Sequence, residues 1–119
     1  MNYEELHSYC MSLKGATEHF PFDEVTLVIK VQGKMFALLP LDNTETQITL
    51  KCDPERAIAL REEFSMITPA FHFNKKHWNS VYMHPEISED FVCELINHSY
   101  QLVVEGLTRK LRGELLEMK

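Results

Sequence analysis

Two short apolar runs joined by a two-residue turn constrain the fold of this chain most strongly. Residues 25–31 read VTLVIKV and residues 34–39 read KMFALL, with Gln32 and Gly33 between them. Apolar, β-branched runs separated by two residues that end in glycine are typical of a tight antiparallel hairpin. The chain is therefore expected to contain a sheet in which these two strands are neighbours.

The hairpin also predicts which side chains share a face, because side chains alternate along a strand and cross-strand partners point the same way. The core face is expected to carry three pairs, namely Val31 with Lys34, Ile29 with Phe36 and Leu27 with Leu38. The other face is then mixed and contains Thr26, Val28, Lys30, Met35, Ala37 and Leu39.

The remaining elements follow from periodicity and capping residues. Helices are predicted for residues 2–13, 53–64 and 88–116, capped by Asn2, Asp53 and Ser88. The last pattern is long for a small domain, so a bend near residues 97–99 or at Gly106 is expected. Further strands are predicted for residues 46–52, 67–73 and 78–83. Residues 16–24 read as a connector, which the rings of Phe20 and Phe22 are expected to pin to the sheet.

This order predicts an α+β fold in two layers: helix, three strands, helix, two strands, and one or more helices. The sheet is expected to be antiparallel and five-stranded, with helices on one face only, which leaves the other face open. With 119 residues and 45% apolar content, the chain is expected to form a single domain over residues 1–119.

Composition narrows the class of protein. The formal net charge of -6 argues mildly against a dedicated nucleic-acid binder, which usually carries a basic balance. Cys10, Cys52 and Cys93 form no CxxC pair, and no apolar run is long enough for a signal peptide or a membrane span. These observations predict a reduced, cytoplasmic protein without a membrane partner, whose cysteines fill space.

Five segments, taken together in order and spacing, resemble the MmcQ/YjbR family of small bacterial proteins. They are GATEHFPF at 15–22, VQGKMFAL at 31–38, ITLKCDPERA at 48–57, TPAFHFNKKHW at 68–78 and SYQLVVEGLTRKLR at 99–112. The resemblance implies a frataxin-like (CyaY-like) or secretion-chaperone-like fold, with an antiparallel sheet backed by helices. The family is generally described as DNA-binding, and no enzymatic activity or catalytic set defines it. Lys14 stands where the resemblance places proline, which concerns only the end of the first helix.

The open sheet face is the first candidate site. Lysines beside aromatic rings suit nucleic acid, because rings stack on bases while ammonium groups meet phosphates. If Val81 and Met83 face the helices, Trp78, Ser80 and Tyr82 lie on the open face. Separately, Lys75 and Lys76 at the loop tip are suited to sequence-independent contacts with a duplex backbone. The predicted nucleic-acid-binding residues are Lys30, Lys34, Lys51, Lys75, Lys76, His77 and Trp78.

Other readings of the same residues stay open. Trp78 could belong to the core while the lysines only keep the surface charged. A partly apolar open face could equally bind a protein partner or close a homodimer. The basic cluster of Arg109, Lys110 and Arg112 is interpreted as cations near a helix C-terminus, with a part in a DNA patch left open.

Metal and catalytic sites are only weakly indicated. His72, His77 and His84 lie on or beside neighbouring strands, but their spacing fits no compact metal motif. No arrangement of cysteines, serines and histidines matches a nucleophilic motif, and no glycine-rich phosphate loop is present. The sequence therefore predicts no enzymatic activity, no cofactor and no metal.

Overall fold

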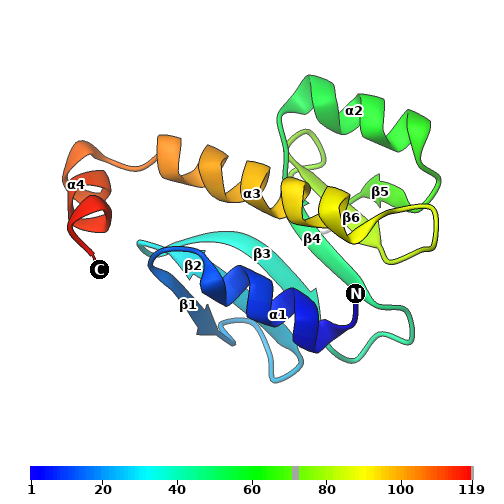
Figure 1. Cartoon of the computed structure of the whole chain (residues 1–119), viewed down its shortest axis with the longest axis horizontal. Coiled ribbons are helices and arrows are strands. Elements are labelled where there is room, and N and C mark those ends of the chain that lie inside the picture. The colour runs from blue at the N-terminus through cyan, green and yellow to red at the C-terminus, as the bar shows by residue number, and fades with distance from the viewer. Residues whose placement is uncertain (71–72, 119) are drawn as a thin grey trace.

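The structure is a computed structural model that describes residues 1–70 and 73–118. The described residues form four helices and an antiparallel sheet of six strands. The strands are β1 (Ala16–His19), β2 (Thr26–Val31), β3 (Lys34–Pro40), β4 (Gln47–Lys51), β5 (Ile67–Pro69) and β6 (Trp78–Tyr82), in the sheet order β1-β2-β3-β4-β6-β5. The helices are α1 (Tyr3–Ser12), α2 (Pro54–Glu63), α3 (Glu89–Glu105) and α4 (Arg109–Glu117) (Figure 1).

The predicted helices and their caps are confirmed. Asn2 forms a reciprocal capping box at the start of α1, and Asp53 and Ser88 each accept a hydrogen bond from the third amide of their helix. The long C-terminal pattern breaks at Gly106, one of the two predicted places, and Thr108 caps the separate helix α4. The antiparallel sheet was also predicted correctly, with its helical layer on one side.

The sheet has six strands and not the predicted five, and the bounds of two strands also differ from the prediction. Residues 16–19 were assigned to a connector, but they form the edge strand β1, which pairs with β2. Ala16 is half-buried and the other three residues of β1 are exposed. Because the strand buries almost nothing, its sequence ATEH shows no apolar alternation from which a strand could be predicted. The predicted strand at 67–73 is confirmed only in its first part: β5 ends at Pro69, the Ala70 amide still donates to the Trp78 carbonyl at 3.1 Å, and residues 71–72 of the prediction lie outside the described residues.

A bulge in β3 moves side chains between the two faces of the sheet. The prediction paired Ile29 with Phe36, but Ile29 pairs with Ala37, and Phe36 is the extra residue of the bulge. Leu38 therefore pairs with Val28 instead of Leu27, and it lies on the face away from the helices rather than in the main core.

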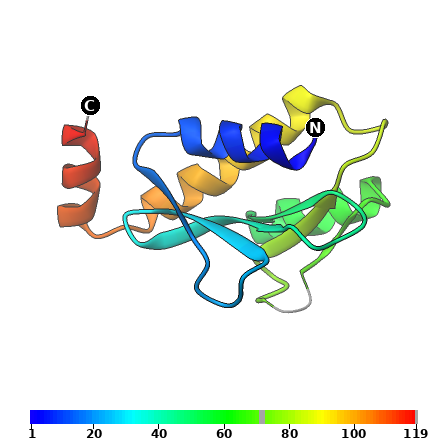
Figure 2. The same ribbon diagram turned by 90° about the horizontal axis from the view of Figure 1, so that it is seen from below.

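Each face of the sheet has its own apolar cluster. The larger cluster lies between the sheet and the helices, and α1 and α3 run along the same side of the sheet in Figure 2. Its fully buried members include Leu6, Ile29, Phe36 and Ile96. The opposite face, which we call the open sheet face, has a small cluster of Val28, Leu38, Ala70 and Trp78, with Met35 and Phe73 packed against it.

The basic cluster of Arg109, Lys110 and Arg112 is placed differently from the prediction. Because the chain breaks at Gly106, these residues begin α4 instead of ending a long helix. All three side chains are exposed. Cations at a helix N-terminus meet the positive end of its dipole, so the predicted dipole stabilisation is wrong and the interaction is unfavourable.

Gly15 makes room for α4. Its φ is +74°, and a Cβ at this position would lie only 2.6 Å from Leu115 Cδ1 of α4. The helix is also tied to the β2–β3 turn, since Gln32 Nε2 donates to the carbonyl oxygen of Leu111 at 2.9 Å. The contact between α4 and the rest of the domain therefore depends on a residue without a side chain.

We expect Gly15→Ala to lower the free energy of unfolding by about 1–3 kcal/mol, because alanine is strained at positive φ and its methyl group must displace Leu115. Chemical denaturation followed by circular dichroism measures this change. Gly33→Ala is the matched control, since Gly33 has a φ of +80° but no atom within 4 Å of an added Cβ. Equal losses in the two variants would contradict a packing role for Gly15.

Candidate binding site on the open sheet face

The open sheet face is hollowed at one end. A cavity of about 760 Å³, which we call the hollow, lies over the ends of β2, β3, β4, β5 and β6. Ligand pockets in proteins are commonly about 300–1,000 Å³. Asp23 is the only charged residue among the described residues that line it. The apolar lining residues are Phe22, Leu38, Pro40, Pro69, Ala70 and Phe73.

Two segments rise beside the hollow. Residues 20–25, between β1 and β2, and residues 73–77, before β6, both project on the side of the sheet opposite α1 and α3 (Figure 2). The first segment is held by Asp23, whose Oδ1 accepts from the amides of Thr26 at 2.6 Å and Val25 at 3.0 Å. These two hydrogen bonds, Thr26 first, lower the pKa of Asp23 and keep its carboxylate ionised.

The floor of the hollow is polar and largely buried. The register of β4 with β6 places Gln47 opposite Tyr82 and Thr49 opposite Ser80 on the open sheet face. Thr49 Oγ1 and Ser80 Oγ lie 3.3 Å apart and form a hydrogen bond. The Gln47 side chain is only 7% exposed. Within residues 1–70 and 73–118 its carboxamide has no hydrogen-bond partner, and its polar atoms are open to the hollow.

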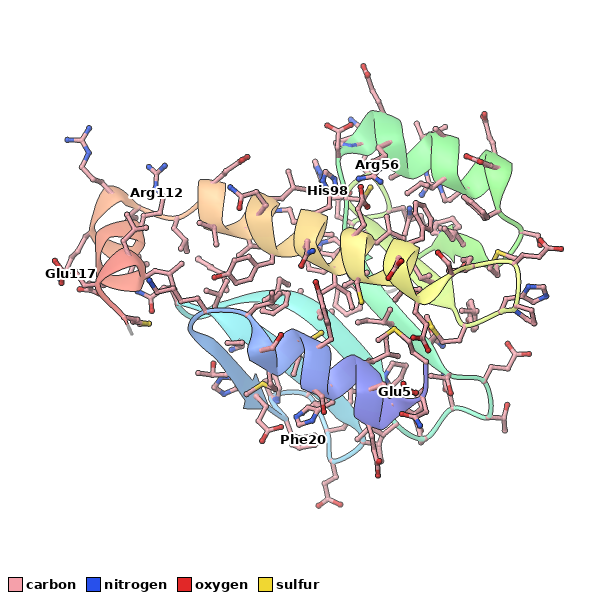
Figure 3. The ribbon with its side chains drawn as sticks, in the orientation of Figure 1. Glu5, Phe20, Arg56, His98, Arg112 and Glu117 are labelled. Carbon is pink, nitrogen blue, oxygen red and sulfur yellow. The ribbon has the colours of Figure 1, made fainter. Side chains whose placement is uncertain are left out.

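Several large apolar side chains are exposed next to the hollow. Phe20 is 49% exposed and Phe22 is 61% exposed, so the prediction that these rings pin the connector to the sheet is wrong. Phe20 is labelled on the connector between β1 and β2 in Figure 3. Val25 and Leu41 are exposed too, and the Leu41 amide donates to the Val25 carbonyl at 2.8 Å. The connector and the end of β3 therefore form one continuous apolar rim.

The predicted nucleic-acid-binding lysines do not line the hollow. β2 and β4 run in the same direction, so Lys30 and Lys51 lie together at the other end of the open sheet face. They stand two strands apart, which corresponds to about 10 Å. Lys34 does not join them, because it pairs with Val31 and shares the helix side of the sheet with that residue.

Trp78 lies on the open sheet face, as predicted for a residue that stacks on bases. Its ring is nevertheless covered, as predicted for a core residue. The side chain is 8% exposed and packs against Phe73, with the ring centroids 6.0 Å apart. It belongs to the small cluster with Val28 and Leu38. Since a covered ring has no free face for a base, Trp78 is a core residue of this face and not the stacking residue that was predicted.

The loop before β6 holds the remaining predicted residues. Lys75 and Lys76 are exposed, and the Lys75 carbonyl accepts from Arg61 Nη1 of α2 at 2.9 Å. His77 is half-buried, and its carbonyl accepts from the Cys52 amide at 2.7 Å. The backbone of this loop is thus fixed to α2 and to the end of β4, and its two lysines adjoin the end of the sheet that carries Lys51.

The histidine hypothesis finds little support. His72 lies outside the described residues, and His84 accepts the Glu86 amide through Nδ1 at 3.1 Å, as a turn residue does. In the described part of the chain, no group of three or more histidine, cysteine, aspartate or glutamate side chains is arranged to hold a metal ion.

The cysteines are free and poorly suited to nucleophilic chemistry. Burial raises the pKa of Cys10 to about 12, and burial is also the main reason that the pKa values of Cys52 and Cys93 are raised. A reactive cysteine requires a lowered pKa, because the thiolate is the nucleophile. Cys10 and Cys52 are buried, which agrees with the predicted space-filling role.

A polar cluster between α2 and α3 was not predicted. Arg56 Nη2 donates to both carboxylate oxygens of Glu94 at 2.8 Å, and His98 Nε2 accepts from the Asp53 amide at 3.2 Å. Figure 3 shows Arg56 and His98 beside each other. Burial, and then the charge of Arg56, lower the pKa of His98. The neutral imidazole is therefore the form that joins α3 to the start of α2.

Stability should depend on pH through His98. Because its pKa is lower in the folded chain, the unfolded chain binds more protons as pH falls below about 6.5. This contribution is fully present above the ordinary histidine pKa and is lost as pH falls through the folded value. We expect His98→Gln, which keeps a hydrogen-bond acceptor, to flatten the pH dependence between about pH 5 and 7. Urea denaturation across this range measures it, and an unchanged slope would contradict the assignment.

Comparison with known proteins agrees with the family resemblance. Residues 11–102 match the model of the YjbR family. The chain belongs to the YjbR family. This confirms the predicted family, while the frataxin-like fold stays a prediction. No described helix is long and apolar enough to cross a membrane.

Similar YjbR-family proteins span nearly the same length. The uncharacterized protein YjbR of Escherichia coli K12 is 32% identical over 118 residues, which is 99% of this chain and 100% of that protein. The uncharacterized protein YbdF of Escherichia coli O157:H7 is 41% identical over 91 residues, or 76% of this chain and 75% of that protein.

Two solved structures share the fold. The protein DR2400 of Deinococcus radiodurans, with a domain called DUF419, has a TM-score of 0.89 and 38% identity over 96% of this chain and 87% of its own. A protein from Pseudomonas syringae has a TM-score of 0.73 and 28% identity over 86% of this chain and 98% of its own. None of these names states a ligand or an activity.

Proposed function

We propose that this YjbR-family protein is a non-catalytic module that binds a protein partner, and that the hollow receives an extended segment of that partner. The observation that carries this proposal is the Gln47 carboxamide, which is 7% exposed in the floor of the hollow and has no hydrogen-bond partner among the described residues. No buried side-chain nitrogen or oxygen of the described residues lacks a partner, so the polar atoms of Gln47 are accessible from the hollow and available to a ligand. A carboxamide offers both donors and an acceptor, and a peptide group offers one of each.

The apolar groups around the hollow support a protein partner. Protein-binding surfaces combine a central aromatic or aliphatic contact with a polar surround. Phe22 and Phe73 line the hollow together with two prolines, and Phe20 stands exposed on the same connector. Large exposed apolar side chains gathered around one depression are typical of an interaction site.

The edges of the sheet are less suited to a partner than its face. β1 has four residues, and its Glu18 carboxylate pairs with His7 Nε2 at 2.6 Å. β5 has only three residues and ends at Pro69. Short edges that carry charges or proline resist pairing with another strand. A homodimer formed by strand pairing is therefore disfavoured, and the open sheet face is the better surface.

Ser80→Trp tests the site by filling the hollow. A random dodecapeptide display library is selected against the wild-type protein, and the enriched peptides are then measured against the variant. We expect at least about a tenfold loss of affinity, the equivalent of about 1.4 kcal/mol. Ser8→Trp is the matched control, because Ser8 is exposed on α1. Peptides that bind Ser80→Trp as well as the wild type, or a selection without enrichment, would refute the proposal.

Gln47→Leu separates binding from stability. Leucine has a similar size but no polar atoms, so the variant should be about as stable as the wild type, since the carboxamide makes no hydrogen bond to the described residues that would be lost. The same change should weaken the selected peptides by about tenfold, because a hydrogen bond to the peptide is lost. Thermal unfolding and fluorescence anisotropy measure the two effects. A variant that loses stability and keeps its affinity would contradict the role assigned to Gln47.

Nucleic-acid binding is a second candidate, located at the other end of the open sheet face. It is favoured by Lys30 and Lys51, which share that end, and by the adjoining Lys75 and Lys76. The test is fluorescence anisotropy with single- and double-stranded DNA at two salt concentrations. Affinity should fall steeply with salt and on replacing Lys30 and Lys51 by alanine, but not with Lys34→Ala. Absence of binding at low salt would remove this candidate.

A cytoplasmic location also remains part of the proposal. The three cysteines are free in the structure, and two of them are buried among apolar side chains. Free cysteines of this kind are usual in proteins from reducing compartments.

A further inference from the structure

The two ends of the open sheet face carry opposite charge. Residues 15–29 and 36–50 supply the β1–β2 connector and the ends of β2, β3 and β4 at the hollow, and they contain no lysine or arginine, whereas Lys75 and Lys76 stand on the loop at its other side. They do contain acidic side chains, namely Glu18, Asp23, Glu24, Asp42 and Glu45. The sheet lysines Lys30 and Lys51 lie at the opposite end. A ligand that enters the hollow therefore meets a negative field on the side of the β1–β2 connector.

Asp23 brings this charge into the hollow itself. Its side chain is exposed and lines the cavity, and two backbone amides fix its Oδ1. Its Oδ2 interacts only with Thr26 Oγ1, at 3.2 Å, within the described part of the chain. A carboxylate oxygen can accept more than one hydrogen bond, so Oδ2 is free to receive a cationic donor.

Aromatic rings line the same hollow as Asp23. Phe22 comes from the same connector, and Phe73 and Tyr82 come from the opposite side. The faces of such rings attract ammonium and guanidinium groups, more strongly for guanidinium because it also stacks. A carboxylate beside aromatic rings is a suitable site for the end of a lysine or arginine side chain.

We propose that the partner segment that occupies the hollow carries a basic side chain, arginine or lysine, which pairs with Asp23 while the peptide backbone meets Gln47. This inference rests on the proposed function and names the chemistry of the occupant. A peptide fits better than a free polyamine, because most of the residues that line the hollow are uncharged. Gln47 can hydrogen-bond a peptide group, and the prolines and aromatic rings can contact apolar side chains. The acidic surroundings favour a basic segment over an acidic one.

The test uses four fluorescein-labelled pools of heptapeptides with a fixed central residue and degenerate flanks. The central residue is arginine, lysine, citrulline or glutamate; citrulline has nearly the shape of arginine but no charge. We expect the protein to retain the arginine and lysine pools about fivefold better than the citrulline pool. This ratio corresponds to the upper end of the usual free energy of a solvent-exposed ion pair. The glutamate pool should be retained least.

Asp23→Asn is the decisive variant. Asparagine keeps the oxygen that accepts from the Thr26 and Val25 amides, so the connector should stay folded. The preference for arginine over citrulline should disappear in this variant. Glu117→Gln is the matched control, because it removes one negative charge from the exposed end of α4 (Figure 3). The preference should persist there.

Other outcomes separate this inference from the proposed function. Equal retention of the arginine and citrulline pools, abolished by Ser80→Trp, would overturn the inference and leave peptide binding in place. An arginine preference that survives both Asp23→Asn and Ser80→Trp would place the basic segment elsewhere and overturn it too. Full displacement of the pools by low concentrations of spermidine would assign the site to polyamines instead. Failure to retain any pool would overturn both proposals.

Discussion

Phe36→Ala is expected to lower the free energy of unfolding by about 3–5 kcal/mol, the usual cost of truncating a fully buried aromatic side chain. The Phe36 side chain is 0% exposed and packs edge-on against the ring of Tyr100, with the centroids 5.3 Å apart. The extra residue of the β3 bulge thus points into the main core. Its truncation leaves a cavity between the sheet and α3.

Urea denaturation followed by circular dichroism measures this loss. Phe22→Ala is the matched control, because Phe22 is 61% exposed and its truncation should change stability by less than about 0.5 kcal/mol. A loss below about 1.5 kcal/mol for Phe36→Ala would show that Phe36 does not occupy the core position described.

Ser99→Ala is expected to cost about 2–3 kcal/mol, which is large for the loss of one oxygen atom. Ser99 is 0% exposed on α3, and its Oγ donates to the Phe36 carbonyl at 2.6 Å and accepts from the Lys51 amide at 2.9 Å. Both backbone groups belong to strands next to the bulge, where the regular ladder is interrupted. Without the hydroxyl, a buried N–H and a buried C=O each lose a partner.

Thermal and urea unfolding measure the effect of Ser99→Ala. Ser8→Ala on the exposed face of α1 is the control and should be neutral or slightly stabilising, because alanine is the better helix former. A neutral Ser99→Ala variant would contradict the idea that α3 supplies the hydrogen bonds that the bulge leaves unmade.

The hairpin and the helix ends could be predicted because local chemistry determines them. Gln32 and Gly33 both have positive φ, at 50° and 80°, which is the turn geometry that their place between two strands predicts. Asn2, Asp53 and Ser88 cap their helices within three residues of their own position. Such interactions involve neighbours in sequence, so their signal is present in the residues themselves.

The bulge and the edge strand could not be predicted, because they depend on distant partners. Residues 34–39 alternate too weakly to show that Phe36 is an extra residue, and the oxygen that supports the bulge comes from Ser99 on α3. β1 is recognisable only by its pairing with β2. Predicting either feature requires knowing how the helix and the sheet meet.

The position of the candidate site on the open sheet face could not be predicted either, because it too depends on residues that are distant in sequence. The sequence drew attention to lysines and Trp78, but the register places Lys30 and Lys51 at one end and the hollow at the other. Within residues 46–52, which the sequence predicts as a strand, nothing distinguishes Gln47 as a buried residue of a binding site, yet it is 7% exposed in the structure. The one sequence signal for the hollow is that residues 15–29 and 36–50 lack lysine and arginine.

Binding of a peptide segment in the hollow can be observed residue by residue with nuclear magnetic resonance. The arginine-centred heptapeptide pool is titrated into the ¹⁵N-labelled protein, and shifts of backbone and side-chain amide signals are recorded. We expect the shifts to concentrate at residues 22–26, 47–49, 68–69 and 80–82, and the Gln47 side-chain NH₂ signals to move with them. Shifts confined to Lys30, Lys51 and residues 75–76, or a Gln47 side chain that does not respond, would contradict binding in the hollow.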